Sequence, residues 1–376
     1  MIEIYQGIIV FAVAFVVTLL MVPASKAIAT KIGAIDYPGN RRMNTVPIPR
    51  CGGIALYLGL LAACFTMYLG IRFFGWDATD LYVMKDVNYL VLFLGVTAMF
   101  SVGLVDDITQ LSPAIKLSGQ VIAAVIVVIA GVSISTVRSI ADGEMVTLGW
   151  LDYPLTVIYL VAFVNIINLI DGIDGLAAGI VAIIAVSLLY LVFTRGSFTL
   201  TTLCIALGAV CFAFLFYNFP PASVFMGDSG SHLLGLVVGI VAISGIVRAQ
   251  SLVVLLVPVI IAGVPVLDTL SAIIRRMRGS QPVREGDTNH IHHRLLKAGL
   301  GPRKAVVVLY LCSAALALIG IMLSESSDVV QWIILMVLAI VIFFVIWKFG
   351  LFKPVLKHYY DNKGRRGSRQ TSKKDK

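Results

Sequence analysis

The sequence predicts an all-α, polytopic membrane protein with about eleven transmembrane helices, the N-terminus outside and the C-terminus in the cytoplasm. Hydrophobic residues make up 59% of the 376 positions and charged residues only 13%, with a mean hydropathy of +0.97. A soluble domain carries about 25% charged residues, so the composition excludes that class. The other two observations are a series of long apolar runs and an uneven distribution of Lys and Arg along them.

The apolar runs are long enough to cross a hydrocarbon core of about 30 Å, which requires roughly 20 residues per helix. Scanning the chain predicts spans at Gly7–Val22, Gly52–Ile71, Asn88–Val105, Ile115–Val132, Tyr153–Ile170, Leu176–Phe193, Leu200–Asn218, Leu233–Val247, Leu252–Ile274, Ala305–Leu323 and Val329–Trp347. The segment before the first run lacks the positive charge of a cleaved signal peptide. We therefore expect the first run to be an uncleaved anchor.

The basic residues set the orientation. Cytoplasmic loops of membrane proteins carry an excess of Lys and Arg. With the N-terminus outside, 24 of the 29 basic residues fall in cytoplasmic segments and five fall outside. An error in the number of spans would scramble this asymmetry, so it supports both the span count and the orientation.

The chain is expected to form one membrane domain, residues 1–348, followed by a basic cytoplasmic tail, residues 349–376, that is disordered in solution. The tail accounts for much of the net charge of +9 and favours contact with anionic membrane lipids over nucleic acid, which we do not expect as a partner. The five cysteines form no close-spaced pair, so neither a disulfide framework nor a zinc site is predicted.

Five aspartates lie at the ends of predicted spans on the cytoplasmic side. Asp106 and Asp107 end the third span in GLVDDI, Asp171 and Asp174 follow the fifth in NLIDGIDGLAAG, and Asp228 precedes the eighth in FMGDSGSHLLG. A charged side chain at the centre of a membrane helix costs about 2.5 to 3.5 kcal/mol. Any one of the five could be a solvated interfacial residue, but their gathering on one side favours a catalytic site.

Clustered carboxylates repel one another unless a positive charge lies between them. Hard oxygen ligands suit Mg²⁺, which binds through one or two carboxylates together with substrate phosphates. The cluster therefore predicts a divalent metal, Mg²⁺ with Mn²⁺ as an alternative, and phosphate chemistry.

Two basic loops face the same side. The loop after the ninth span contains HIHHRLL with His290, His292, His293 and Arg294. Three histidines could ligate zinc, but a His/Arg loop beside phosphate chemistry favours anion binding, because guanidinium groups bind phosphate oxygens bidentately. The Pro/Gly-rich loop DYPGNRRMNTVPIPRCGG, which contains Arg50, is either a structured cover over the site or a topological anchor.

VDD, NLIDGIDGL, MGDSGS and HIHHRLL, in this order and at the ends of successive spans, resemble the polyprenyl-phosphate N-acetylhexosamine-1-phosphate transferase family. The resemblance extends to about Lys348. The HIHHRLL form and the PIPRCGG loop are similar to the branch that uses UDP-GlcNAc and undecaprenyl phosphate, including enzymes that start wall teichoic acid and O-antigen synthesis. The loop departs from the family at Asn44, where a histidine is common.

The resemblance implies roles for individual residues. Asp228 would be the main Mg²⁺ ligand, with Asn168 near the metal and the diphosphate. Asp106 and Asp107 would activate the lipid phosphate.

Asp171 and Asp174 match the family's second aspartate pair, with Asp174 placed to contact the uracil. Lys116 and the loop from His290 to Arg294 would hold the diphosphate and the sugar, and Arg50 would bind substrate. The implied enzyme is a Mg²⁺-dependent UDP-N-acetylglucosamine:undecaprenyl-phosphate N-acetylglucosamine-1-phosphate transferase of the cell membrane, active at the cytoplasmic face and compatible with a homodimer.

In the implied reaction, the lipid phosphate attacks the β-phosphorus of UDP-GlcNAc and UMP leaves. Direct attack and a two-step route through an aspartyl-phosphate both stay open. Other UDP-sugars, including the phospho-MurNAc-pentapeptide donor, are alternatives within the family. From other classes, an ion-coupled secondary transporter would show repeated halves and a midplane site, and a CDP-alcohol phosphotransferase would show a DG..AR motif; neither feature is found.

Overall fold

The computed structural model describes residues 2–38, 46–76, 87–138, 145–246, 252–264, 266–268, 270–271, 274, 295 and 299–349. The predicted substrate residues His290, His292, His293 and Arg294, together with Asn44 and the tail from residue 350, lie outside the described residues.

Helices dominate the described chain. They are α1 (Ile2–Ile32), α2 (Gly53–Phe73), α4 (Tyr89–Thr109), α5 (Pro113–Ile129), α6 (Asp152–Ile170), α7 (Leu176–Thr194), α8 (Phe198–Asn218), α9 (Gly227–Ile246), α10 (Leu252–Ile261), α13 (Pro302–Glu325) and α14 (Asp328–Phe349), with a 3₁₀ turn at Gly149–Leu151. Two antiparallel ribbons join β1 (Ile35–Asp36) to β2 (Ile48–Pro49) and β3 (Thr136–Arg138) to β4 (Met145–Thr147).

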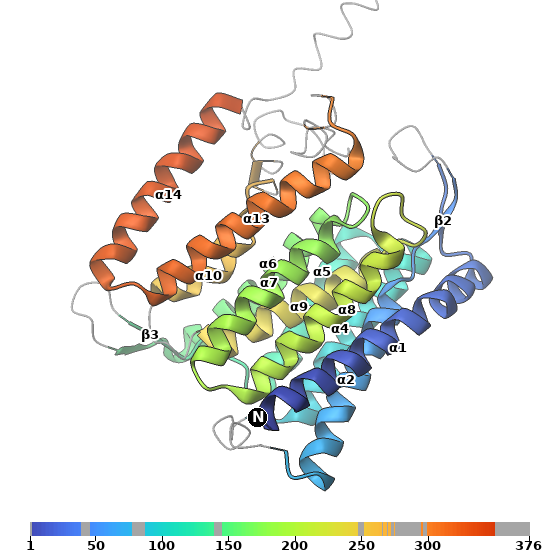
Figure 1. Ribbon diagram of the computed structural model, residues 1–376, viewed down its shortest axis with the longest axis horizontal. Helices are drawn as coiled ribbons and strands as arrows, with labels where there is room; N and C mark the ends of the chain where they lie inside the picture. The colour runs from blue at the N-terminus through green and yellow to red at the C-terminus, as the bar shows by residue number, and fades with distance from the viewer. Residues whose placement is uncertain are drawn as a thin grey trace, which may run out of the picture.

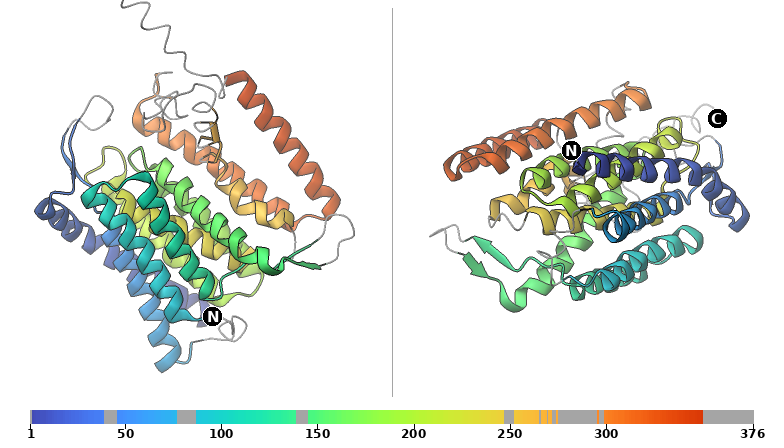
Figure 2. Two further views of the ribbon diagram at one scale, coloured as in Figure 1. Left: turned by 180° about the vertical axis from the view of Figure 1, so that it is seen from behind. Right: turned by 60° about the horizontal axis from the view of Figure 1, so that its bottom comes forward.

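Successive helices run up and down through one bundle, with α1 starting at the end opposite the β1–β2 ribbon (Figures 1 and 2). Helix α9 packs against α2, α4, α6 and α7. It is the most enclosed of the described spans, because 94% of the residues in its most apolar stretch are buried, compared with 11% for α14. Among the described residues, this arrangement places α9 in the protein interior and α14 at the periphery of the bundle. A polar group on α9 therefore has protein rather than lipid as its surroundings.

Nine of the described helices are long and apolar enough to cross a membrane, which confirms an all-α, multi-pass membrane protein. The predicted span at Ile115–Val132 corresponds to the shorter helix α5, which ends at Ile129. The predicted span at Leu252–Ile274 corresponds to α10 over its first ten residues. The total of eleven and the orientation stay predictions.

Helices α1 and α9 extend well beyond their predicted bounds. Helix α1 continues through Pro23 to Ile32 instead of ending at Val22, because membrane helices tolerate an internal proline. Helix α9 begins at Gly227, not at Leu233. Asp228 therefore lies in the first turn of a helix rather than in the loop before it.

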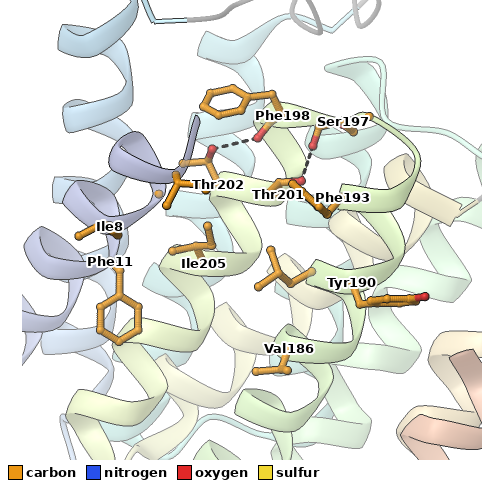
Figure 3. Close-up of a pocket in the computed structure, with 14 residues that line it drawn as sticks. Ile8, Phe11, Val186, Tyr190, Phe193, Ser197, Phe198, Thr201, Thr202 and Ile205 are labelled. Carbon is orange, nitrogen blue, oxygen red and sulfur yellow. Dashed lines mark hydrogen bonds between the residues drawn. The ribbon is translucent and has the colours of Figure 1, made fainter. Parts of the chain in front are cut away.

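An apolar groove of about 690 Å³ lies at the end of the bundle where α1 and α8 begin and α7 ends. Ile8, Phe11, Phe193 and Ile205 are among its lining residues (Figure 3). Its threonine hydroxyls donate to carbonyls of their own helix, Thr201 to Ser197 and Thr202 to Phe198. The groove therefore presents hydrocarbon to its surroundings and is remote from the aspartate motifs.

Candidate active site

The Lys116 ammonium gathers oxygen atoms from three other helices. Its Nζ lies 3.4 Å from Asp106 Oδ2 at the end of α4 and 3.4 Å from Asn168 Oδ1 at the end of α6, and it donates to Asp228 Oδ2 at the start of α9. Ser112 caps the start of α5, followed by Pro113 at the first helical position, which fixes Lys116 in the first turns of that helix. Four residues from four segments thus meet at one end of the bundle, as the motifs predict.

Asn168 holds the cluster together through its amide. Its Nδ2 donates to Asp228 Oδ1 at 2.9 Å and to Ser231 Oγ at 3.0 Å. Because Oδ1 is then left to face Lys116, both ends of the amide have a defined partner. One carboxylate oxygen of Asp228 consequently accepts from the Lys116 ammonium and the other from the Asn168 amide. The Asp228 side chain is therefore oriented before any substrate binds.

Asp107 faces the start of α9 rather than Lys116. It accepts from the backbone N–H groups of Asp228 at 2.8 Å and Ser229 at 3.0 Å, and from Ser229 Oγ at 2.6 Å. The first N–H groups of a helix have no partner within the helix, and a carboxylate there is further favoured by the helix dipole. The arrangement identifies Asp107 as the group that anchors the first turn of α9.

Arg50 links the basic loop to both aspartate motifs. Its Nη2 lies 3.3 Å from Asp107 Oδ1 and 3.9 Å from Asp228 Oδ1. The flanking backbone pairs with the segment before α9, since Phe225 N donates to Pro49 O and Gly52 N to Phe225 O. The described part of this loop therefore contacts the site, and the choice between a cover and a topological anchor stays a prediction. Burial alone would lower the Arg50 pKa, but the carboxylates of Asp107 and Asp228 outweigh it and raise that pKa.

Two glycines allow these close approaches. Gly227 has a φ of +71°, and a Cβ added to it would meet Arg50 O and Asp107 Oδ2. A Cβ on Gly103 would meet the backbone of Asp228 and Ser229. Larger residues at either position would separate α4 from α9. Both positions therefore require glycine by contact, and Gly227 requires it by conformation as well.

Asp171 lies beside this cluster without joining it. Within the described part of the chain its carboxyl has no hydrogen-bonding partner, and its backbone N–H donates to Asn168 O at 3.3 Å. Burial raises the pKa of Asp171 well above its ordinary value, and the negative charges of Asp228 and Asp107 act in the same direction. Its predicted catalytic role stays a prediction.

Asp174 belongs to a neighbouring cavity. Its Oδ2 accepts from Ala222 N at 2.8 Å, and it lines a space of about 570 Å³. The other lining residues are Ile173, Pro220, Pro221, Gly301, Pro302, Arg303 and Lys304. A carboxylate and two cations at the mouth of one cavity form a polar site adjacent to the Lys116 cluster.

Tyr310 supports the loop that carries Asp174. Its hydroxyl donates to Gly175 O at 2.5 Å, while Gly175 N donates to Asn218 Oδ1 at 3.0 Å. The turn is thus held from α13 on one side and from α8 on the other. Sequence reasoning missed Tyr310, because it sits in an apolar span without a polar motif around it.

Sequence reasoning also missed Ser229, Ser231, Arg303 and Lys304 as site residues. Ser229 and Ser231 could have been predicted from the motif MGDSGS, because hydroxyls beside a helix start commonly bind neighbouring polar groups. Arg303 and Lys304 entered only the charge count that set the orientation. Nothing in the sequence indicates that the start of α13 lies beside Asp174 in the folded protein.

The oxygen atoms around Lys116 form a donor set that suits a hard divalent cation. Asp106, Asn168 and Asp228 present two carboxylates and one amide carbonyl to a single positive group. Among the described residues no three His, Cys, Asp or Glu side chains come together as a metal cage. Two carboxylates with room for phosphate oxygens is nevertheless the usual Mg²⁺ arrangement, so these residues fit that ion.

Comparison with known proteins decides the family. Residues 89–246 match the family model described as glycosyl transferase family 4. A probable undecaprenyl-phosphate N-acetylglucosaminyl 1-phosphate transferase of Bacillus subtilis is 35% identical over 94% of this chain and 96% of its own length. The chain belongs to glycosyl transferase family 4, that of the polyprenyl-phosphate N-acetylhexosamine-1-phosphate transferases.

Two other members show how widely the similarity extends. A decaprenyl-phosphate N-acetylglucosaminephosphotransferase of Mycobacterium tuberculosis H37Rv is 33% identical over 79% of this chain and 78% of its own. The undecaprenyl-phosphate alpha-N-acetylglucosaminyl 1-phosphate transferase of Escherichia coli K12 is 29% identical over 93% of this chain and 95% of its own. The family resemblance carried by the motifs is confirmed, and the chain is a multi-pass membrane phosphotransferase.

Proposed function

We propose that this family 4 member transfers GlcNAc-1-phosphate from UDP-GlcNAc to undecaprenyl phosphate, giving undecaprenyl-diphospho-GlcNAc and UMP. The observation that carries the proposal is the meeting of Asp106, Asn168 and Asp228 around Lys116 at one end of the bundle. A site at the membrane boundary suits a reaction between a water-soluble nucleotide and a membrane-bound isoprenoid.

The names of the relatives support this choice of substrates. The Bacillus subtilis and Escherichia coli proteins are named for undecaprenyl phosphate and N-acetylglucosamine, and the mycobacterial protein for decaprenyl phosphate and the same sugar. The sugar is common to all three names while the polyprenyl length differs. GlcNAc is therefore the better supported part of the assignment.

Asp228 and Asn168 would hold Mg²⁺, or Mn²⁺ in its place. When bound, the ion would neutralise the negative charge that develops on the transferred phosphate. Asp228 is suited to this role because Asn168, which also donates to Ser231, fixes the position of its carboxylate. Asp106 would complete the set of oxygen donors.

The protein's own cations would act on the same charge. Lys116 and Arg50 lie beside Asp228, where they can offset charge on the diphosphate during transfer, and preorganised charge is the main contribution of proteins to phosphoryl transfer. The second pKa of a phosphate monoester is about 6, so the lipid phosphate is largely ionised at neutral pH. General-base help from Asp106 would then be modest.

The cellular setting completes the proposal. The excess of Lys and Arg in the loops on the side of the site supports a location at the cytoplasmic face of the cell membrane. The reaction would be the first membrane step of a cell-envelope polysaccharide such as wall teichoic acid. Two copies could assemble as a homodimer. Asp174, in its cavity with Arg303 and Lys304, would contact the uracil of the nucleotide.

The test follows UMP release by purified protein in detergent with undecaprenyl phosphate, Mg²⁺ and a panel of UDP-sugars. We expect release with UDP-GlcNAc and its loss after EDTA treatment, with recovery when Mg²⁺ is restored. Release with UDP-MurNAc-pentapeptide instead would move the chain to another donor within the family. Absence of release with every donor, from monodisperse protein supplied with lipid acceptor, would overturn the proposal.

A further inference from the structure

A second polar layer lies beneath the Lys116 cluster, inside the bundle. Gln120 Oε1 accepts from Asn165 Nδ2 at 2.8 Å, and Gln120 Nε2 lies 3.1 Å from His232 Nε2. Gln120 and His232 are 1% and 0% exposed. Taking polar side chains out of water into an apolar bundle costs free energy that hydrogen bonds only offset, and apolar residues would pack at these positions without that cost.

The layer repeats the active-site contacts one helical turn deeper. Gln120 follows Lys116 by four residues on α5, His232 follows Asp228 by four on α9, and Asn165 precedes Asn168 by three on α6. Residues three or four apart share one face of a helix. The same three helices are therefore tied together twice, first at the site and then directly below it.

The hydrogen-bond directions in this layer follow from one backbone carbonyl. Asn165 Nδ2 also donates to Val161 O at 2.8 Å, and a carbonyl can only accept, which fixes the orientation of the Asn165 amide. The Gln120 atom that it contacts must then be the acceptor Oε1, so Gln120 Nε2 donates to His232 Nε2. His232 is accordingly neutral with its proton on Nδ1, an atom without a partner among the described residues.

We infer that His232, Gln120 and Asn165 are positioning residues of the transferase site, fixing the rotation of α5, α6 and α9 so that Lys116, Asn168 and Asp228 meet. Hydrogen bonds between buried polar side chains select one arrangement of helices where apolar packing would accept several. A displacement of about 1 Å in a catalytic group can cost about a hundred-fold in rate. The inference rests on the proposed function for its kinetic test but not for its geometry.

The geometry is tested by NMR of protein labelled with ¹⁵N-histidine. His232→Gln identifies the His232 resonances by their disappearance. We expect the neutral Nδ1–H form in the wild type and a changed spectrum in Gln120→Leu. Observation of the Nε2–H form, or no response to Gln120→Leu, would overturn the inference whether or not the protein shows transferase activity.

The kinetic test compares Gln120→Leu and His232→Leu with Gln6→Leu, the same change at a buried glutamine near the start of α1, whose amide has no partner among the described residues. We expect the two layer variants to lose kcat by about ten- to a hundred-fold, with a smaller change in KM for UDP-GlcNAc. Gln6→Leu should behave as wild type, because replacing an unpaired buried amide by an apolar group is nearly neutral.

Two further variants separate positioning from folding. His232→Gln, which can still accept from Gln120, should recover much of the activity that His232→Leu loses. The double variant Gln120→Leu/His232→Leu should lose little beyond Gln120→Leu alone, because that change already removes the contact that His232→Leu removes. Equal kcat in Gln120→Leu and Gln6→Leu would overturn the inference, whereas an inactive wild type would instead overturn the proposed function.

Discussion

At the scale of single residues, the adjacent aspartates Asp106 and Asp107 contact different parts of the protein. Neighbouring residues on a helix do not face the same way, and Asp106 turns to Lys116 whereas Asp107 turns to the start of α9. The sequence predicts both as catalytic because it shows only their proximity. Which of them faces the site depends on α5 and α9, which approach α4 only in the folded protein.

Asp228→Asn should lower UMP release by about a hundred-fold or more, as removal of a preorganised electrostatic group typically does, while the protein still inserts and purifies. The reason is that the carboxylate accepts from both Lys116 and Asn168. Asp152→Asn is the matched control, because Asp152 is also an acid in the first turn of a membrane helix, α6, at its other end. Normal turnover by Asp228→Asn would remove Asp228 from the metal site.

Asp174→Ala should raise the KM for UDP-GlcNAc more than it lowers kcat, because Asp174 lines the cavity beside the cluster rather than the cluster itself. Steady-state kinetics over a range of nucleotide sugar concentrations provide the measurement. Leu176→Ala, two residues along and buried, controls for loosening of the turn. Similar effects of the two substitutions would argue against a direct contact with the nucleotide.

At the scale of elements, the apolar spans could be predicted closely and the polar helix starts could not. Hydropathy locates α7 and α8 within a few residues of their observed bounds. It misses the first turn of α9, because glycine, serine and aspartate carry no apolar signal there. That turn is helical because Asp107 satisfies its N–H groups from another helix, and a tertiary contact of this kind leaves no local trace in the sequence.

Asp107→Asn should destabilise the protein by about 1 to 3 kcal/mol, the cost of leaving buried donors poorly satisfied. Thermal unfolding in detergent measures the effect. Ser229→Ala should add little to it, because both substitutions weaken the same hydrogen bond of 2.6 Å. Unchanged stability together with lost turnover would instead give Asp107 a direct part in the reaction.

Tyr310→Phe should raise the KM for UDP-GlcNAc about five-fold, corresponding to the roughly 1 kcal/mol of one hydrogen bond. The substitution removes only the bond from the Tyr310 hydroxyl to Gly175 O, which holds the turn carrying Asp174. Tyr190→Phe, in the apolar groove at the other end of the bundle, makes the same chemical change away from the site. Equal KM values in both variants would show that the turn does not depend on α13.

At the scale of the whole molecule, the site motifs share one position at the end of the helix bundle. Motifs spread from Arg50 to Asp228 come together because each stands where a helix begins or ends at the same end of the bundle. The sequence predicts their common side from charge alone. It could not predict that Lys116 lies between Asp106, Asn168 and Asp228, since no spacing along the chain encodes contacts among four helices.

The orientation of the bundle in the membrane leads to a final prediction. Phe74 follows α2 at the end opposite the site and is 76% exposed, and Tyr37 follows β1 at the site end and is 60% exposed. In a cysteine-free background, a membrane-impermeant thiol reagent should label Phe74→Cys in intact cells and Tyr37→Cys only in inverted vesicles, because the basic loops are retained in the cytoplasm. Labelling of Tyr37→Cys in intact cells would reverse the orientation. The site would then face away from the cytoplasmic supply of nucleotide sugar, and the proposed reaction would lose its donor.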